Sequence, residues 1–182
     1  MPSTPAARAA AFAPGAPLYT VDQANRALPY VRRVVEDLVR DHAAWRRCLA
    51  ALDARHPARR PAPPPPASDV PADPAALRRL AARLSADVQS ALGELAALGV
   101  ECKGLDVGLV DFPAVVDGAP AYLCWQLGEP AVAWWHRPEA GFAGRQPLDA
   151  AAFGDPVLGE QALDKALGTA LPDGASAGEA RP

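Results

Sequence analysis

The residues best suited to chemistry lie in the second half of the chain. Seven polar side chains gather there, which are Glu101, Asp106, Asp111, Glu129, His136, Glu139 and Arg145. A histidine beside carboxylates can hold a divalent metal ion or share a proton in acid–base catalysis. We therefore expect a ligand-binding site made of Asp111, Glu129, His136 and Arg145. Within it, His136 and Asp111 are the candidate ligands for a divalent metal.

Whether these groups meet depends on how their strands pair. Asp117-Gly118 stands between two runs rich in β-forming residues and predicts a two-residue hairpin turn. Pairing outward from this turn places Asp111 opposite Cys124. A two-residue turn at Gly128-Glu129 then puts His136 on the apolar face of the sheet, whereas a three-residue turn puts it on the face of Asp111. A shift of one residue moves every side chain across the sheet, and the sequence leaves both registers open.

Each candidate site residue could instead have a purely structural role. Asp111 could be an edge carboxylate, and His136 a hydrogen-bonded structural residue. Arg145 follows Gly141-Phe142-Ala143-Gly144, where glycines let backbone N–H groups approach an anion and the arginine could hold a phosphate or carboxylate. The spacing fits no standard phosphate-binding fingerprint. An ion pair between Arg145 and an acid such as Glu129 is the favoured interpretation.

The three cysteines are Cys48, Cys102 and Cys124. An odd count without a Cys-x-x-Cys pair argues against a disulfide framework and against a zinc site, and it fits a reducing cytoplasm. We interpret these cysteines as small buried apolar residues. The chain has no Gly-x-Ser-x-Gly elbow, and Cys124 gains a histidine base only with the three-residue turn. The sequence therefore leans against an enzyme.

A long helix is expected before the polar region, over residues 21–55. Thr20 and Gln23 fit a capping box at its start. Its apolar residues alternate spacings of three and four, which is typical of a coiled-coil seam. One row holds Val21, Leu28, Val35, His42 and Leu49, and the other holds Ala24, Val31, Leu38, Trp45 and Leu52.

A proline-rich linker over residues 57–72 leads to a second helix over 74–98. Asp73 is placed to cap this helix, with Pro74 in its first turn. Gly99 suits the end of the helix, where a left-handed residue closes a Schellman motif. The two patterned helices predict an antiparallel, coiled-coil-like hairpin.

The expected fold is α+β, with the helical hairpin packed on a small three-stranded antiparallel β-meander over residues 108–136. A loop with glycines and arginine follows at 141–148. One face of the meander is apolar and should cover the helices, through Val110, Phe112, Val116, Leu123 and Trp125. A single domain spans 18–153, between a disordered tail at 1–17 and a weak helix with a disordered tail at 154–182.

Charge and hydropathy exclude several functions. The net charge is −3, and acids are interspersed among the arginines of the helices, so a nucleic-acid partner is not expected. No apolar run approaches the ~18–20 residues of a membrane span, and no secretory signal is apparent, which predicts a cytoplasmic protein. The leading hypothesis is a non-enzymatic binding or assembly protein. It would form a homo-oligomer through the part of the first helix's apolar seam that the shorter second helix leaves uncovered. The alternative is a metal- or small-anion-binding protein, or an enzyme, with its site on the meander.

Several short motifs are distinctive along the chain. The first is YTVDQANRALP at residues 19–29, and the later ones are GLVDFP at 108–113, LCW at 123–125, GE at 128–129, WH at 135–136 and GFAGRQPL at 141–148. These motifs resemble those of a bacterial family known as domain of unknown function 2203. The resemblance covers residues 18–148. It supports the expected architecture and implies no activity.

Overall fold

The computed structural model describes residue 12 and residues 16–55 and 70–148. The expected weak helix and tail at 154–182, nearly all of the N-terminal tail and most of the proline-rich linker lie outside these residues. Of the helices that the structure describes, none is long and apolar enough to cross a membrane.

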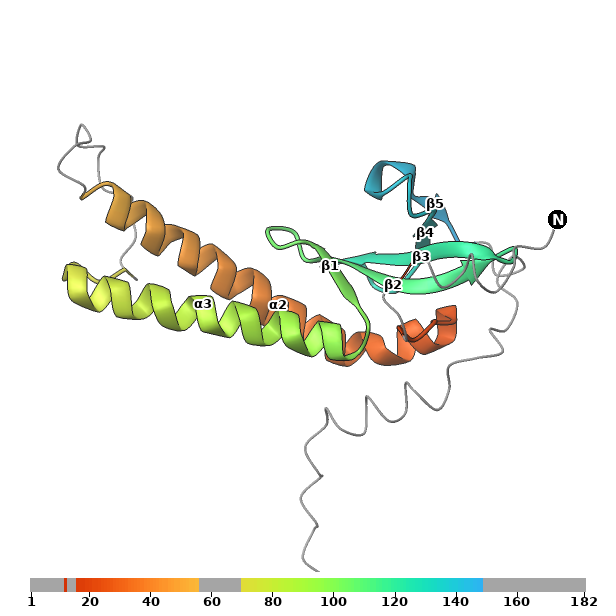
Figure 1. The fold of residues 1–182 in the computed structure, drawn as a ribbon, viewed down its shortest axis with the longest axis horizontal. Helices are drawn as coiled ribbons and strands as arrows, with labels where there is room; N and C mark the ends of the chain where they lie inside the picture. The colour runs from red at the N-terminus through yellow and green to blue at the C-terminus, as the bar shows by residue number, and fades with distance from the viewer. Residues whose placement is uncertain (1–11, 13–15, 56–69, 149–182) are drawn as a thin grey trace, which may run out of the picture.

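The fold is α+β, as expected from the sequence, with two described helices followed by an antiparallel sheet (Figure 1). Helix α2 (Val21–Asp53) begins at the predicted capping box. The Thr20 hydroxyl accepts a hydrogen bond from the N–H of Gln23 at 2.9 Å, and the Gln23 side chain accepts one from the N–H of Thr20 at 2.9 Å. The helix ends at Asp53, two residues before the predicted end.

Helix α3 (Pro74–Ala97) begins at the predicted residue and ends one residue before the predicted end. The Asp73 carboxylate accepts hydrogen bonds from two backbone N–H groups of the first turn. At the other end, Gly99 has φ 71°, and the N–H of Val100 bonds to the carbonyl of Leu95 at 2.9 Å. This is the Schellman ending, which glycine permits because it lacks a Cβ.

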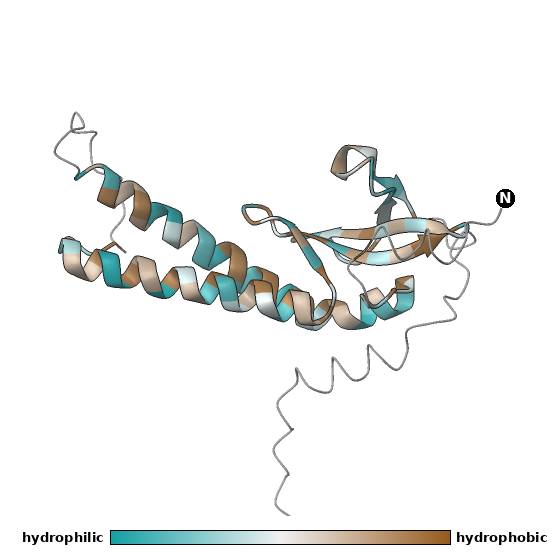
Figure 2. Cartoon of the chain, viewed as in Figure 1, coloured by the Kyte–Doolittle hydropathy of each residue, from teal (hydrophilic) through white to brown (hydrophobic). Residues whose placement is uncertain are grey.

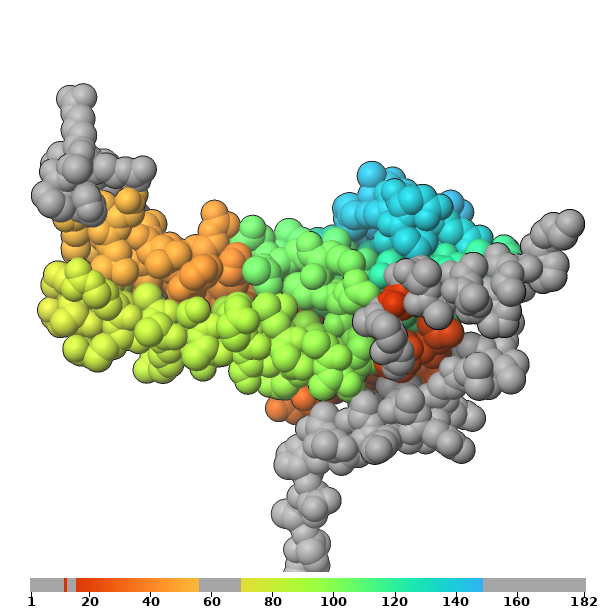
Figure 3. Space-filling view, viewed as in Figure 1, coloured from red at the N-terminus to blue at the C-terminus, as the bar shows by residue number. Residues whose placement is uncertain are grey.

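The two helices lie side by side and run in opposite directions. The Tyr30 hydroxyl, early in α2, donates to Glu94, late in α3, at 2.8 Å. Toward the other ends of the helices, Cys48 packs in one cluster with Leu77. Figure 3 shows this part of the helix pair extending beyond the sheet.

Within residues 16–55 and 70–148, the sheet has five strands in the order β1-β2-β3-β4-β5, so the predicted three-stranded meander is wrong in strand number. The strands are β1 (Glu101–Gly104), β2 (Leu109–Val116), β3 (Ala119–Gln126), β4 (Trp134–His136) and β5 (Gln146–Pro147). The two missed strands lie at the edges of the sheet. β1 is short and mixed in polarity, and β5 has two residues, one of them proline. Neither carries the alternating pattern by which a strand is recognised in a sequence.

The β2–β3 hairpin has the predicted register. Asp117 and Gly118 form its two-residue turn with φ 50° and 75°, as a type I′ turn requires. Asp111 therefore lies opposite Cys124. Both central residues of this turn need positive φ, which aspartate and glycine adopt more readily than most residues.

The position of His136 settles the register that the sequence left open. β4 begins at Trp134 rather than near residue 131, so the connection from β3 is longer than either turn considered. His136 pairs with Tyr122. The alternation along β3 therefore places His136 on the same face as Asp111.

The apolar face of the sheet covers α2, and together they form the main core. Phe112, Leu123 and Trp125 are fully buried in one cluster with Val31 and Val35 of α2. Figure 2 shows hydrophobic stretches on the helices and the strands of this region. The sheet thus covers part of the apolar seam of α2. The sequence had left open whether a second subunit covers this part of the seam.

Candidate functional site

Three side chains that can bind a metal meet on the outer face of the sheet, away from α2. Asp111 comes from β2, Cys124 from β3 and His136 from β4, so three neighbouring strands contribute one residue each. All three are buried, with exposed fractions of 2% for Asp111 and 3% for His136 and none for Cys124. Because their strands are hydrogen-bonded to one another, the sheet itself fixes how these side chains face each other.

The donor atoms of the three residues are close enough to share one ion. One ligand atom from each lies within 4.8 Å of the other two. His136 Nε2 is 3.2 Å from Asp111 Oδ2. The second carboxylate oxygen, Asp111 Oδ1, is buried and has no hydrogen-bond partner among the described residues. We name this group the Asp-Cys-His cluster.

The other ring nitrogen of His136 determines what Nε2 presents to Asp111. Nδ1 lies 2.8 Å from the carbonyl oxygen of Arg137. A carbonyl only accepts hydrogen bonds, so Nδ1 carries a hydrogen and donates it. The 3.2 Å contact between Nε2 and Asp111 Oδ2 then needs one more proton, carried by the imidazolium as an ion pair or by the carboxyl group. When that proton leaves, Nε2 and the carboxylate both offer lone pairs to a cation between them. Metal-binding histidines are usually held in this way, with the second nitrogen bonded to a carbonyl or carboxylate.

Burial also controls the ionisation of the cluster. It raises the pKa of the Asp111 carboxyl. The charge of His136 and a hydrogen bond with the Cys124 thiol act in the opposite direction and lower this pKa. The pKa of the Cys124 thiol is raised as well, first by burial and then by the charge of Asp111. A thiol with a raised pKa is a weak nucleophile on its own. A bound cation would reverse this, because coordination deprotonates a thiol.

Arg145 and Glu129 form a second group on the same face. Arg145 Nη2 lies 2.8 and 2.9 Å from the two carboxylate oxygens of Glu129. The guanidinium also stacks on two aromatic rings, 5.2 Å from the centre of Trp134 and 4.9 Å from that of Phe142. The favoured interpretation of Arg145, an ion pair with Glu129, is therefore what the structure shows.

The ion pair lies beside the Asp-Cys-His cluster. Trp134, on which Arg145 stacks, is the cross-strand partner of Cys124. Glu129 accepts a hydrogen bond from the backbone N–H of Gln126, two residues after Cys124, at 2.8 Å. The four predicted site residues thus share one face, arranged as a histidine–aspartate pair and an arginine–glutamate pair.

A third polar group borders the cluster on its other side. Glu101 of β1 lies opposite Asp111 and accepts a hydrogen bond from the Tyr122 hydroxyl at 2.9 Å. The ring of Tyr122 is 5.6 Å from that of His136. Lys103 pairs with Glu101 at 2.6 Å and closes this border.

Two of the seven polar residues singled out in the sequence lie apart from the cluster. Asp106 pairs with Arg46 of α2 at 2.9 Å. Glu139 is exposed and follows β4. Neither therefore contributes to the site.

Cys124 is the candidate ligand that the sequence analysis did not assign to the site. Counting Cys-x-x-Cys pairs argued against a zinc site and left this cysteine as a buried apolar residue. The available signal was its predicted position opposite Asp111 on the polar face. A single cysteine becomes a candidate ligand once a carboxylate and a histidine share its face, whatever the spacing in sequence.

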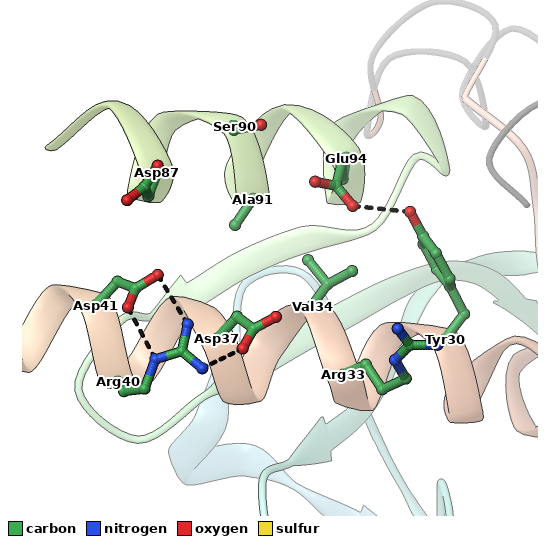
Figure 4. A pocket seen from close by; sticks show the side chains of 10 residues that line it. All are labelled: Tyr30, Arg33, Val34, Asp37, Arg40, Asp41, Asp87, Ser90, Ala91 and Glu94. Carbon is green, nitrogen blue, oxygen red and sulfur yellow. Dashed lines mark hydrogen bonds and ion pairs between the residues drawn. The ribbon is translucent and has the colours of Figure 1, made fainter. Parts of the chain in front are cut away.

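A separate groove of about 380 Å³ lies between α2 and α3 (Figure 4). Its polar groups largely satisfy one another. Arg40 pairs with Asp37 and Asp41, and Tyr30 bonds to Glu94. The groove is lined by exposed or partly exposed polar residues together with the buried Val34 and Ala91, and none of the predicted site residues lines it.

Comparison with known proteins identifies the family alone. The model of the family described as "Uncharacterized conserved protein (DUF2203)" matches residues 17–148. The chain belongs to this family, as its sequence motifs suggested. No curated protein and no solved structure gives a significant match.

Proposed function

We propose that this protein binds a divalent transition-metal ion through Asp111, Cys124 and His136. The observation that carries the proposal is the convergence of three different donor atoms within 4.8 Å, from three strands, at a buried position. A buried carboxylate oxygen without a partner is costly. A cation at this point would satisfy Asp111 Oδ1 and the lone pair of His136 Nε2 together.

The donor set favours ions of the zinc class. Thiolate and imidazole bind zinc and similar transition metals well, whereas magnesium and calcium prefer sites made of oxygen atoms. Cys124 is a free thiol and so is available as a ligand. His136 already has the carbonyl hydrogen bond that orients a metal-binding ring.

The test is metal binding by purified protein and matched cysteine variants. The protein is stripped of metal, reloaded with Co²⁺ and followed by visible and near-ultraviolet absorption. We expect one ion per chain and a sulfur-to-cobalt charge-transfer band. Cys124→Ser should abolish that band. Cys102→Ser should keep it, because Cys102 packs toward the apolar core.

Elemental analysis gives an independent readout on the zinc-loaded chain. We expect stoichiometric zinc in the wild type and in Cys102→Ser, and its loss in His136→Ala. The proposal is wrong if the wild type binds no stoichiometric ion. It is also wrong if Cys124→Ser and His136→Ala bind zinc as the wild type does.

Self-assembly through α2 is the second candidate function. Leu49, a predicted seam position near the end of α2, is 42% exposed, unlike the buried seam residues Val31 and Val35. This exposed apolar side chain supports contact with a second copy of the chain. Sedimentation over a wide concentration range should show an oligomer that Leu49→Asp weakens, and a strict monomer would exclude this function.

A further inference from the structure

The Asp-Cys-His cluster supplies three ligands, one fewer than zinc normally takes. Structural zinc sites are closed by four protein ligands, whereas three protein ligands leave a position for an exchangeable molecule. Among the described residues, no fourth histidine, cysteine or carboxylate joins this group. What lies next to the cluster therefore decides what the remaining position would accept.

The neighbour on the β4 side is Arg145, and one of its N–H groups has no acceptor. Arg145 Nε is buried and without a hydrogen-bond partner among the described residues, although Nη2 is held by Glu129. A buried donor left unpaired is costly, which makes it a potential anchor for a ligand.

Strand register brings the guanidinium of Arg145 close to the cluster. Trp134 lies directly opposite Cys124, and the guanidinium of Arg145 stacks on the Trp134 ring. Its contacts with the rings of both Trp134 and Phe142 limit where the guanidinium can move.

We propose that a metal ion in the Asp-Cys-His cluster keeps one exchangeable position and that a small oxyanion binds there, anchored also by Arg145. One oxygen of the anion coordinates the metal, and another accepts the Nε–H of Arg145. This inference rests on the proposed metal site. It adds a ligand class to it, namely small molecules with a carboxylate or phosphate group.

The opposite border of the cluster is less suited to an anion. There, Lys103 is already paired with Glu101, and the other oxygen of Glu101 accepts the Tyr122 hydroxyl. A carboxylate held between these two groups would repel a second anion. Lys103 therefore provides a matched control, because it is a cation on the same face whose ammonium group is paired with Glu101.

The test uses the full chain loaded with Co²⁺ and titrated with sodium formate, with sodium perchlorate keeping the ionic strength constant. We expect a saturable change in the visible cobalt spectrum of the wild type. Because a hydrogen bond to a charged group is worth about 1.5–3 kcal/mol, Arg145→Gln should weaken formate binding by roughly tenfold or more. Lys103→Gln should leave it within about twofold, as expected for an exposed ion pair.

A double variant separates the hydrogen bond from the loss of charge. Glu129→Gln with Arg145→Gln removes one negative and one positive charge, so the net charge beside the cluster is unchanged. We expect it to bind formate as weakly as Arg145→Gln does. Circular dichroism and cobalt stoichiometry confirm that each variant folds and holds the metal.

The outcomes distinguish the two proposals. If Co²⁺ does not bind the wild type, the metal site itself is wrong. If Co²⁺ binds but its visible spectrum does not change with formate, the metal has no exchangeable coordination position and the oxyanion proposal is wrong. It is also overturned if Arg145→Gln and the double variant bind formate with wild-type affinity.

Discussion

The two faces of the sheet are built from alternate residues of the same strands, and both are buried in different ways. The inner face presents Val110, Phe112 and Leu123 to α2, and apolar packing accounts for their burial. The outer face buries Asp111 and Cys124 just as completely, but one Asp111 carboxylate oxygen has no partner in the described part of the chain. Burial of apolar groups stabilises a fold, whereas burial of an unpaired polar group costs free energy.

This difference indicates where function is to be sought. The apolar side chains of the inner face are buried against α2 and need no ligand to account for their burial. The outer face has two buried polar atoms that the described residues do not satisfy, the acceptor Asp111 Oδ1 and the donor Arg145 Nε. Polar networks of this kind are retained either for specificity of folding or for binding, and substitutions on the two faces should separate these roles.

The largest effect on stability is expected on the inner face. Phe112→Ala removes a fully buried ring and should lower the free energy of unfolding by about 3–5 kcal/mol. Phe142→Ala is the matched control, because Phe142 is 50% exposed, and it should cost less than about 1 kcal/mol. Urea denaturation followed by circular dichroism measures both, and equal losses would show that the inner face is not the main core.

A different response is expected on the outer face. Asp111→Asn should change the stability of the metal-free chain by less than about 1 kcal/mol, because the asparagine amide has the same shape and can still donate a hydrogen bond to His136 Nε2. It should abolish the stabilisation by zinc, which in the wild type is about 2.7 kcal/mol at a free concentration one hundred times the dissociation constant.

Val110→Ala is the control for that experiment, since Val110 is the neighbouring residue and points to the inner face. It should cost about 2 kcal/mol in stability and leave the zinc effect intact. If Asp111→Asn destabilises the metal-free chain by more than Val110→Ala does, the carboxylate serves the fold rather than a metal.

Much of the polar face could be predicted from the sequence because local rules fix it. The Asp117-Gly118 turn determines the register of β2 and β3, and that register places Asp111 opposite Cys124. The capping residues Thr20 and Asp73 likewise fix where the two helices begin. Each of these features depends on residues that are close in sequence.

The parts that escaped prediction depend on contacts between distant residues. The face of His136 depends on the connection after β3, where the Asn25 side chain of α2 accepts a hydrogen bond from Val132 at 2.9 Å. Arg32, also of α2, binds the carbonyl of Glu129 at 2.9 Å. These tertiary contacts hold a connection whose own residues did not indicate its length.

An intermediate, pH-dependent effect is expected at Tyr19, which belongs to the core. Its hydroxyl donates to the carbonyl of Leu98 at 2.6 Å, and burial raises its pKa to about 12. Because the folded chain holds this proton more tightly than the unfolded chain, the stabilisation is complete below pH 10 and is lost as the pH rises toward 12. Tyr19→Phe should be less stable at pH 8 by about 1 kcal/mol.

The difference between wild type and Tyr19→Phe should shrink between pH 10 and 12, as measured by urea denaturation at each pH. A difference that stays constant over this range would mean that the hydroxyl is not held as the structure shows. The outer face should contribute nothing to this comparison, because Tyr19 packs against Phe112 on the inner side.

The smallest effect is expected at the exposed border of the outer face. Lys103→Gln removes a partly exposed ion pair with Glu101 and should change stability by less than about 1 kcal/mol. Zinc affinity, measured by competition with a chelator, should stay within about twofold of the wild type. A large loss of affinity would extend the metal site to this border.

The central claim, that the outer face holds a metal ion, is tested most directly by X-ray absorption at the zinc edge of the zinc-loaded chain. The account predicts one sulfur neighbour at about 2.3 Å and nitrogen or oxygen neighbours at about 2.0–2.2 Å. Cys124→Ser should remove the sulfur neighbour and Cys102→Ser should retain it. A zinc environment of oxygen and nitrogen alone in the wild type, or one unchanged by Cys124→Ser, would contradict the claim.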